Sequence, residues 1–97
     1  MENYQEYYAE YEKKTRSWLK ACSDEELIEI HNRDTCNPGW GTARMIHDGA
    51  LLDEILSRDW DAEILVERDS AIKRIVYKRK LRVRIMDMDG RKILVME

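Results

Sequence analysis

The stretch RIVYKRKLRVRIMDMDGRKILVM, residues 74–96, decides the fold class that we expect for this 97-residue chain. Along its first half, apolar side chains alternate with basic ones, and only residues 76 and 79 break the alternation. A period of two is typical of a strand with one buried and one solvent-facing side. We therefore predict one long strand whose apolar side holds Ile75, Tyr77, Leu81, Val83 and Ile85 and whose cationic side holds Arg74, Lys78, Lys80, Arg82 and Arg84.

A hairpin follows this strand. Asp89 and Gly90 predict a two-residue turn, because both central residues of such a turn must tolerate a positive φ. Lys92 to Met96 then returns as the partner strand, and its last four residues are all apolar. Since side chains alternate between the two faces, two of these four point away from the face that holds Val83. We expect this second apolar side to be covered by the chain's own helices, by a second copy or by a different partner.

The chain before this ribbon has a helical period. In the first segment, apolar and small residues recur at alternating steps of three and four, which predicts an amphipathic helix. Its glutamates lie in the N-terminal half and its lysines and arginine in the C-terminal half, as the helix dipole favours. The stripe consists of Tyr4, Tyr8, Tyr11, Thr15, Trp18 and Cys22.

A short second helix begins after Ser23. The spacing of Ser23 and Glu26 predicts a capping box, in which each side chain bonds to the backbone N–H of the other residue. We expect Leu27 and Ile30 to face inward in this helix, with His31 as a further candidate. It ends before the turn-rich stretch 34–39.

The start of a third helix has two interpretations. Either Asn37 is the N-cap with Pro38 in the first turn, or a turn at Pro38 delays the helix until about Thr42. In both cases the helix runs to about Arg58 and is apolar on most of its circumference. We therefore expect it to be the central helix, covered on more than one side.

These elements together predict a single α+β domain over residues 1–97, with three N-terminal helices packed on a small C-terminal antiparallel sheet of two or three strands. The short apolar run Ala62 to Val66 predicts a strand or the end of a helix. A winged-helix-like arrangement is the alternative, with the third helix in a nucleic-acid groove. The net charge of −1 over residues 38–58 argues against that role.

Composition and charge restrict the protein class. The chain has 17 Lys and Arg against 20 Asp and Glu, and hydrophobic residues at 43% suffice for a small globular core. Nothing approaches the ~20 apolar residues of a membrane span, and the acidic, tyrosine-rich start does not resemble a signal peptide. Two cysteines are too few for a disulfide-stapled secreted domain. We expect a cytoplasmic protein that does not insert into a membrane.

The charge distribution suggests one kind of partner. Residues 1–72 carry 8 basic and 17 acidic side chains, whereas residues 73–97 carry 9 basic and 3 acidic ones. On one strand the basic residues would repeat every ~6.6 Å and follow a phosphate backbone without reading base sequence. The candidate residues for such an anionic partner are Arg74, Lys78, Lys80, Arg82 and Arg84. The negative charge of the whole chain argues against nucleic-acid binding.

The predicted strand over residues 92–96, which has apolar side chains on both faces, suggests another kind of partner. Met86, Ile93 and Val95 are candidates for a protein interface, and Tyr7, which lies beside the first helical stripe, is a further one. Our leading hypothesis is a small non-enzymatic interaction module that binds a protein partner or itself through the C-terminal hairpin. Sequence-independent nucleic-acid binding through the basic strand 73–84 is the alternative.

Catalytic and metal motifs are weak. Cys22, His31, Cys36 and His47 are zinc-ligand types, but their spacing lacks the close pairs of structural zinc sites. A reactive Cys36 assisted by a nearby histidine or aspartate is a minor hypothesis, because ordinary core and surface roles are far more common. The segment 39–42, Gly-Trp-Gly-Thr, lacks the lysine and the preceding strand of a phosphate-binding loop. We therefore predict no catalytic residue, cofactor, metal or small-molecule substrate.

Overall fold

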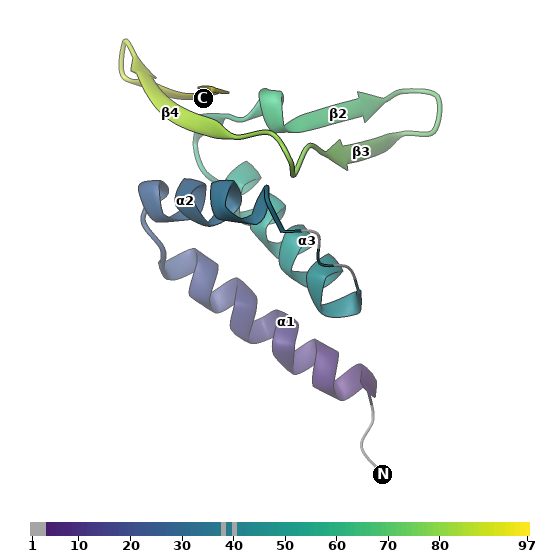
Figure 1. Ribbon diagram of the computed structural model, residues 1–97. Coiled ribbons are helices and arrows are strands. Elements are labelled where there is room, and N and C mark those ends of the chain that lie inside the picture. Colours follow the sequence, from purple (N-terminus) through teal and green to yellow (C-terminus); the bar gives the residue numbers. More distant parts are fainter. Residues whose placement is uncertain (1–3, 38, 40) are drawn as a thin grey trace.

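The described part of the chain, residues 4–37, 39 and 41–97 of a computed structural model, forms three helices followed by a set of short strands (Figure 1). This arrangement confirms the predicted α+β class. None of the helices in these ranges is long and apolar enough to cross a membrane. The elements are α1 (Tyr4–Ala21), α2 (Asp24–Asp34), α3 (Thr42–Ser57), β1 (Trp60–Asp61), the 3-10 helix η1 (Glu63–Leu65), β2 (Val66–Asp69), β3 (Arg74–Tyr77), β4 (Val83–Met88) and β5 (Arg91–Met96).

α1 buries a stripe that differs from the predicted one near its C-terminal end. Thr15 and Cys22 are buried as expected, but the buried residue between them is Leu19, and Trp18 is 47% exposed. Residues 15, 18, 19 and 22 share one side of the helix, so the helical period left positions 18 and 19 both possible, and the packing buries Leu19. The side chain of Tyr4 lies outside the described set.

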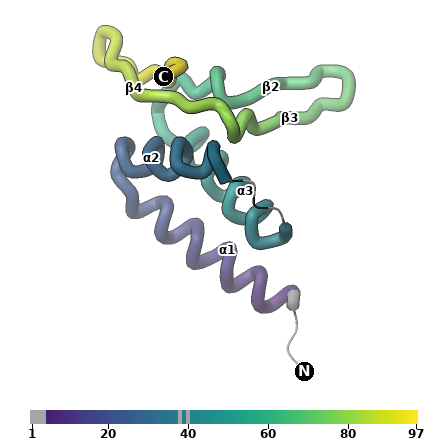
Figure 2. The backbone as a smooth tube through the Cα atoms, in the orientation of Figure 1, coloured from purple at the N-terminus to yellow at the C-terminus, as the bar shows by residue number. Residues whose placement is uncertain are grey.

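α2 begins with the predicted capping box. Ser23 Oγ accepts a hydrogen bond from Glu26 N–H (3.2 Å), and the Glu26 carboxylate accepts one from Ser23 N–H (2.9 Å). The helix lies between the α1–α3 pair and the strands in both backbone views (Figures 1 and 2). It buries Leu27, Ile28 and Ile30, so α2 contributes to the core on both sides.

α3 begins at Thr42, as one of the two interpretations predicted, and Gly41 precedes it with a φ of 137°. The turn expected at Pro38 lies outside the described residues. The helix is not covered on most of its circumference, because Met45 is 66% exposed and Leu56 is 39% exposed. The prediction of a central third helix is therefore wrong, and α2 takes that position.

The C-terminal hairpin is confirmed. β4 pairs with β5 in antiparallel register, and Met88 lies opposite Arg91 across the turn. Asp89 has a φ of 53° and Gly90 a φ of 84°, so both central residues have the positive φ of a type I′ turn. β1 adds a parallel pairing on the other side of β5, which makes this three-stranded sheet mixed. A strand of two residues is too short to show a period, so β1 was not predicted.

The long strand predicted over residues 74–85 is wrong. β3 ends at Tyr77 and pairs with β2 in a separate two-stranded sheet, and β4 starts only at Val83. Between them, Leu81 N–H donates to Lys78 C=O (3.2 Å) in a turn, and Lys78 N–H donates to Leu65 C=O (2.7 Å). The interruption includes residue 79, one of the two positions where the alternation fails. Ile75, predicted to be buried, is 47% exposed.

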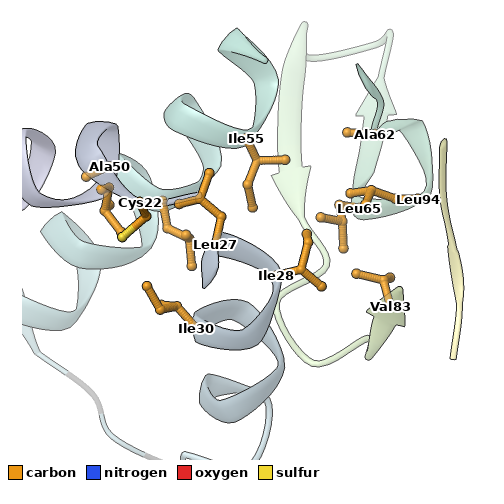
Figure 3. Close-up of a cluster of buried hydrophobic side chains, with 12 residues drawn as sticks. Cys22, Leu27, Ile28, Ile30, Ala50, Ile55, Ala62, Leu65, Val83 and Leu94 are labelled. Atoms are coloured by element: carbon orange, nitrogen blue, oxygen red, sulfur yellow. The ribbon is translucent and has the colours of Figure 1, made fainter. Parts of the chain in front are cut away.

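The segment Ala62 to Val66 is not a strand over its length, and only its last residue belongs to one. η1 occupies Glu63–Leu65, and β2 begins at Val66. The core forms where η1, the helices and the hairpin meet (Figure 3). Its largest fully buried apolar side chains are Leu19, Leu27, Leu51, Ile55, Leu65 and Val83.

The molecule is elongated. Its radius of gyration is 14.5 Å, whereas a compact chain of this length has about 12.5 Å. The N-terminal half of α1 extends away from the strands, which lie on the far side of α2 (Figure 2). The helical end and the hairpin are therefore separate surfaces.

Candidate protein-binding site on the C-terminal hairpin

The hairpin gathers three predicted interface residues on one face. Met86 lies opposite Ile93, and Arg84 lies opposite Val95. Directly opposed residues point to the same side of a sheet, so Met86, Ile93 and Val95 are neighbours. The other side holds Val83 and Leu94, which are buried in the core. We call the neighbouring residues of the first face the outward strip: Met86, Met88, Ile93 and Val95.

The outward strip is apolar with charged borders. Met88 is 52% exposed, the other three residues of the strip are half-buried, and none of the four belongs to the core cluster. Arg84 and Arg91 are exposed on the same face. Asp61 of β1 lies beside Ile93. This arrangement of an apolar centre with a mostly basic border is suited to a protein surface that carries acidic groups.

Ion pairs hold the hairpin against α2. Lys92 Nζ lies 2.5 Å from Asp24 Oδ2, and Arg58 Nη1 lies 2.9 Å from Asp24 Oδ1. The hydrogen bond from Lys92, together with the nearby Arg58, keeps the pKa of Asp24 below its usual range despite partial burial. Because Lys92 points toward α2, its neighbour Ile93 points away from the helices. The ion pair between Lys92 and Asp24 therefore holds the hairpin against α2 and also turns the outward strip away from the helices.

Tyr7 is exposed as predicted but belongs to a different surface. Its side chain is 60% exposed on α1, and its ring meets that of Tyr8 edge-on with centroids 5.2 Å apart. α1 and the hairpin lie on opposite sides of α2 (Figure 1). Tyr7 and the outward strip therefore do not form one binding site.

The basic residues do not form the predicted row. Arg74 lies in β3, Lys78, Lys80 and Arg82 lie in the connection between strands, and Arg84 lies in β4. All five are exposed. A straight array at the strand repeat is therefore excluded for these residues, because the strand that would hold them is interrupted.

Two arginines of the basic segment are neutralised within the chain. Arg82 Nε lies 2.7 Å from Glu97 Oε2, and its Nη1 donates to Asn32 C=O (3.2 Å). Arg79 Nη1 lies 3.0 Å from Asp48 Oδ2 of α3. These contacts lower the positive charge that residues 73–84 present to a partner.

A polar network connects α2 to the strands, and the sequence analysis missed it. His31 is fully buried. Its Nε2 donates to Leu81 C=O (2.6 Å), so its Nδ1 accepts from the Tyr77 hydroxyl (2.5 Å). Burial lowers the pKa of His31 and raises the pKa of Tyr77, so both side chains are neutral near pH 7.

Ion pairs lie beside this network. Arg44 approaches Asp34 (3.6 Å) and Asp48 (3.3 Å), and His47 Nδ1 lies 3.5 Å from Asp34 Oδ2. Burial raises the pKa of Asp48, but the adjacent His47 and Arg79 outweigh that effect and keep the pKa below its ordinary value. Asp34, His47 and Asp48 place potential metal ligands within 4.8 Å. Since two guanidinium groups already compensate the two carboxylates, the group acts as a structural cross-link between α2, α3 and the turn before β4.

The zinc-type residues singled out in the sequence do not assemble. Cys22 is buried at the end of α1, and its Sγ lies 3.4 Å from Trp18 C=O. Burial raises the pKa of this thiol, which disfavours the thiolate that binds metals. Cys36 is exposed near Thr35. Within segment 39–42, Trp40 lies outside the described residues.

The outward strip combines apolar side chains, charged borders and a fixed orientation. The histidine network is hydrogen-bonded within the chain. In the ion-pair group, Asp34 Oδ2, Arg44 Nε and His47 Nδ1 are buried without a hydrogen bond, so charge attraction is the main contact among these residues. Comparison with other proteins adds no relative to this picture. No protein-family model matches the chain, and neither a curated protein nor a solved structure shows significant similarity to it.

Proposed function

We propose that this protein is a small non-enzymatic interaction module that binds a protein partner through the outward strip of the hairpin. The observation that supports this proposal is the position of Met86, Ile93 and Val95, which lie side by side on a face turned away from the core. Contiguous apolar side chains at a surface are typical of binding sites. Methionine adapts its shape to a partner at little energetic cost.

The size and charge of the strip favour a foreign partner over a second copy. Two strands of this length present a face of about 200 Å², whereas a stable complex buries ~800 Å² on each partner. A partner must therefore extend beyond the strip. A face-to-face second copy would bring Arg84 and Arg91 of both copies together, which is unfavourable. A foreign partner whose own surface has an apolar patch bordered by acidic side chains would complement the outward strip.

The oligomeric state in solution distinguishes a second copy from a foreign partner as the molecule that covers the outward strip. We expect a monomer at all concentrations in sedimentation velocity or light scattering. A dimer that dissociates when Val95→Lys places a charge in the strip would assign the surface to a second copy and overturn the foreign partner.

Selection from a displayed peptide library tests partner binding directly. Purified peptides that bind the wild-type protein in calorimetry should lose at least tenfold in affinity for Val95→Lys and for Ile93→Lys. The matched control is Ile75→Lys, which makes the same change at an exposed position of β3. Failure to select any binder, or binders that are equally tight for Val95→Lys and the control, contradicts the proposal.

A mixed-sequence oligonucleotide provides the counter-test. We expect no binding at physiological salt, because the basic residues are dispersed and the chain carries a net negative charge. Binding that weakens steeply with salt and disappears in the double variant Lys80→Glu, Arg82→Glu would replace the proposal with sequence-independent nucleic-acid recognition.

A further inference from the structure

β4 has an open edge. It is the outer strand of the three-stranded sheet, and no described segment pairs with it on the side away from β5 (Figure 1). Glu97 N–H donates to Arg82 C=O (3.1 Å), so the backbone groups of residue 82 point toward β5. Backbone groups of successive strand residues point in alternate directions. Those of Val83, Ile85 and Asp87 therefore point toward the open edge.

Asn32 of α2 occupies one end of this edge. Its side-chain oxygen accepts a hydrogen bond from Val83 N–H (2.9 Å), and its side-chain nitrogen donates one to Val83 C=O (2.7 Å). The amide group thus satisfies Val83 as a neighbouring strand would. The open part of the edge consists of the N–H and C=O groups of Ile85 and Asp87.

A groove of about 490 Å³ runs along this edge between β4 and α2. Ile28, Val83 and Ile85 provide its apolar floor. Exposed Glu25, Glu29 and Asp87 line it as well. Its basic residues are Lys92, which is paired with Asp24 of α2, and the exposed Arg84, and with Glu97 the lining has four acidic side chains against these two. The groove therefore offers unpaired backbone groups, an apolar floor and an acidic rim in one place.

We infer that an extended, basic segment of a partner protein binds in this groove and adds a strand to the β4 edge. Strand addition supplies main-chain hydrogen bonds for affinity, and alternate side chains supply specificity. The basic side chains of the segment face α2, where their charged ends pair with Glu25 and Glu29 and their aliphatic stems cover Ile28. Those that face the other way continue the outward strip beside Met86. This inference rests on the proposed function and adds a second feature to the same partner: beside the apolar patch with an acidic border that covers the outward strip, the partner carries an extended basic segment.

A second copy is a poor occupant of the groove. Antiparallel pairing of two β4 strands would place the α2 helices of both copies side by side. Each helix would then present Glu25 and Glu29 to the same acids of the other copy. Like charges that face each other across an interface repel, so the geometry selects a partner of opposite charge.

A synthetic probe tests the inference. The probe is a fluorescein-labelled, end-capped ten-residue peptide of alternating valine and lysine, and its binding is followed by fluorescence anisotropy. We expect it to bind at least tenfold more tightly than the alternating valine–glutamate peptide. N-methylation of the alternate amides on one edge of the probe should abolish binding, whereas N-methylation on the other edge should not, because only one edge pairs with β4. Equal loss from both edges would overturn strand addition.

Amide exchange locates the bound probe. We expect the N–H groups of Ile85 and Asp87 to exchange at least tenfold more slowly when the probe is bound. The N–H of Val83 should change little, because it already bonds to Asn32. Binding without slower exchange at residues 85 and 87 would place the probe elsewhere and overturn the inference.

Charge reversal tests the acidic rim. The double variant Glu25→Lys, Glu29→Lys should prefer the valine–glutamate peptide. The matched control is Glu10→Lys, Glu67→Lys, which changes the net charge equally at exposed positions outside the groove. It should keep the preference for the valine–lysine probe. A similar loss in both double variants would show nonspecific attraction and contradict the inference.

Val95→Lys separates this inference from the proposed function, since residue 95 lies on β5, away from the open edge. The variant should bind the probe within twofold of wild type. If the probe fails to bind while library-selected partners are sensitive to Val95→Lys, the groove inference is wrong and the proposed function stands. If the probe fails to bind and no selected partner is sensitive to Val95→Lys, both the groove inference and the proposed function are wrong.

Discussion

The hydroxyl of Tyr77 on β3 lies 2.5 Å from Nδ1 of His31 on α2. The two residues are 46 positions apart in the sequence, and their contact joins the two-stranded sheet to the helices. The second ring nitrogen of His31 bonds to Leu81 C=O in the connection to β4. One buried histidine therefore fixes the positions of both ends of the segment between β3 and β4.

Tyr77→Phe should destabilise the protein by ~1–3 kcal/mol, because it leaves a buried ring nitrogen of His31 without its donor. Urea unfolding followed by circular dichroism measures this change in the free energy of unfolding. Tyr7→Phe is the control, since Tyr7 is exposed, and it should change stability by less than ~0.5 kcal/mol. Equal effects of the two substitutions would refute the structural role of the contact.

The stability of the protein should fall as the pH is lowered through the range just below 6.5. Burial lowers the pKa of His31 in the folded protein from its usual value of 6.5. The unfolded chain then binds a proton that the folded protein excludes, so stability is fully present above pH 6.5 and declines as the pH falls toward the folded-state pKa.

His31→Gln isolates this effect. Glutamine retains a donor and an acceptor but does not take up a proton. Thermal melting between pH 7.5 and about 5 should show a shallower pH dependence for the variant than for wild type. Parallel curves for the two proteins would assign the pH dependence to another group.

Arg58→Met should destabilise the protein by about 1–3 kcal/mol, because Arg58 bonds to several partly buried groups. It pairs with Asp24 and Glu54, and it donates to the carbonyl groups of Leu19 and Cys22 at the end of α1. Chemical denaturation is the measurement. Arg33→Met at an exposed position of α2 should have little effect, and a comparable loss there would contradict this account.

Alanine at Gly49 and at Gly90 should change stability in opposite directions. Gly49 lies inside α3 with open space where a Cβ would stand, so Gly49→Ala should stabilise the protein by ~0.5–1 kcal/mol. Gly90 has a φ of 84° in the hairpin turn, so Gly90→Ala should destabilise it by ~1–2 kcal/mol. Differential scanning calorimetry compares the two variants, and a shift of the same sign in both would be inconsistent with this assignment.

Short-range signals predicted the local structure well. The capping box joins Ser23 to Glu26 within one helical turn, and the hairpin turn depends on the positive φ of Asp89 and Gly90. The outward strip was also predictable in part, because four consecutive apolar residues in a strand must place two on each face. Each of these features depends on residues close together in the chain.

The amino-acid sequence alone determined three helices, a C-terminal hairpin and an excess of apolar side chains on that hairpin. The tertiary structure decided where the predicted long strand is interrupted, since Lys78 bonds to Leu65 and His31 bonds to Leu81. It also decided that Asn32 lies against the β4 edge, with the open remainder beside an acidic groove. These contacts join residues 13 to 51 positions apart, and a periodic pattern records which face a residue occupies but not which distant segment it meets.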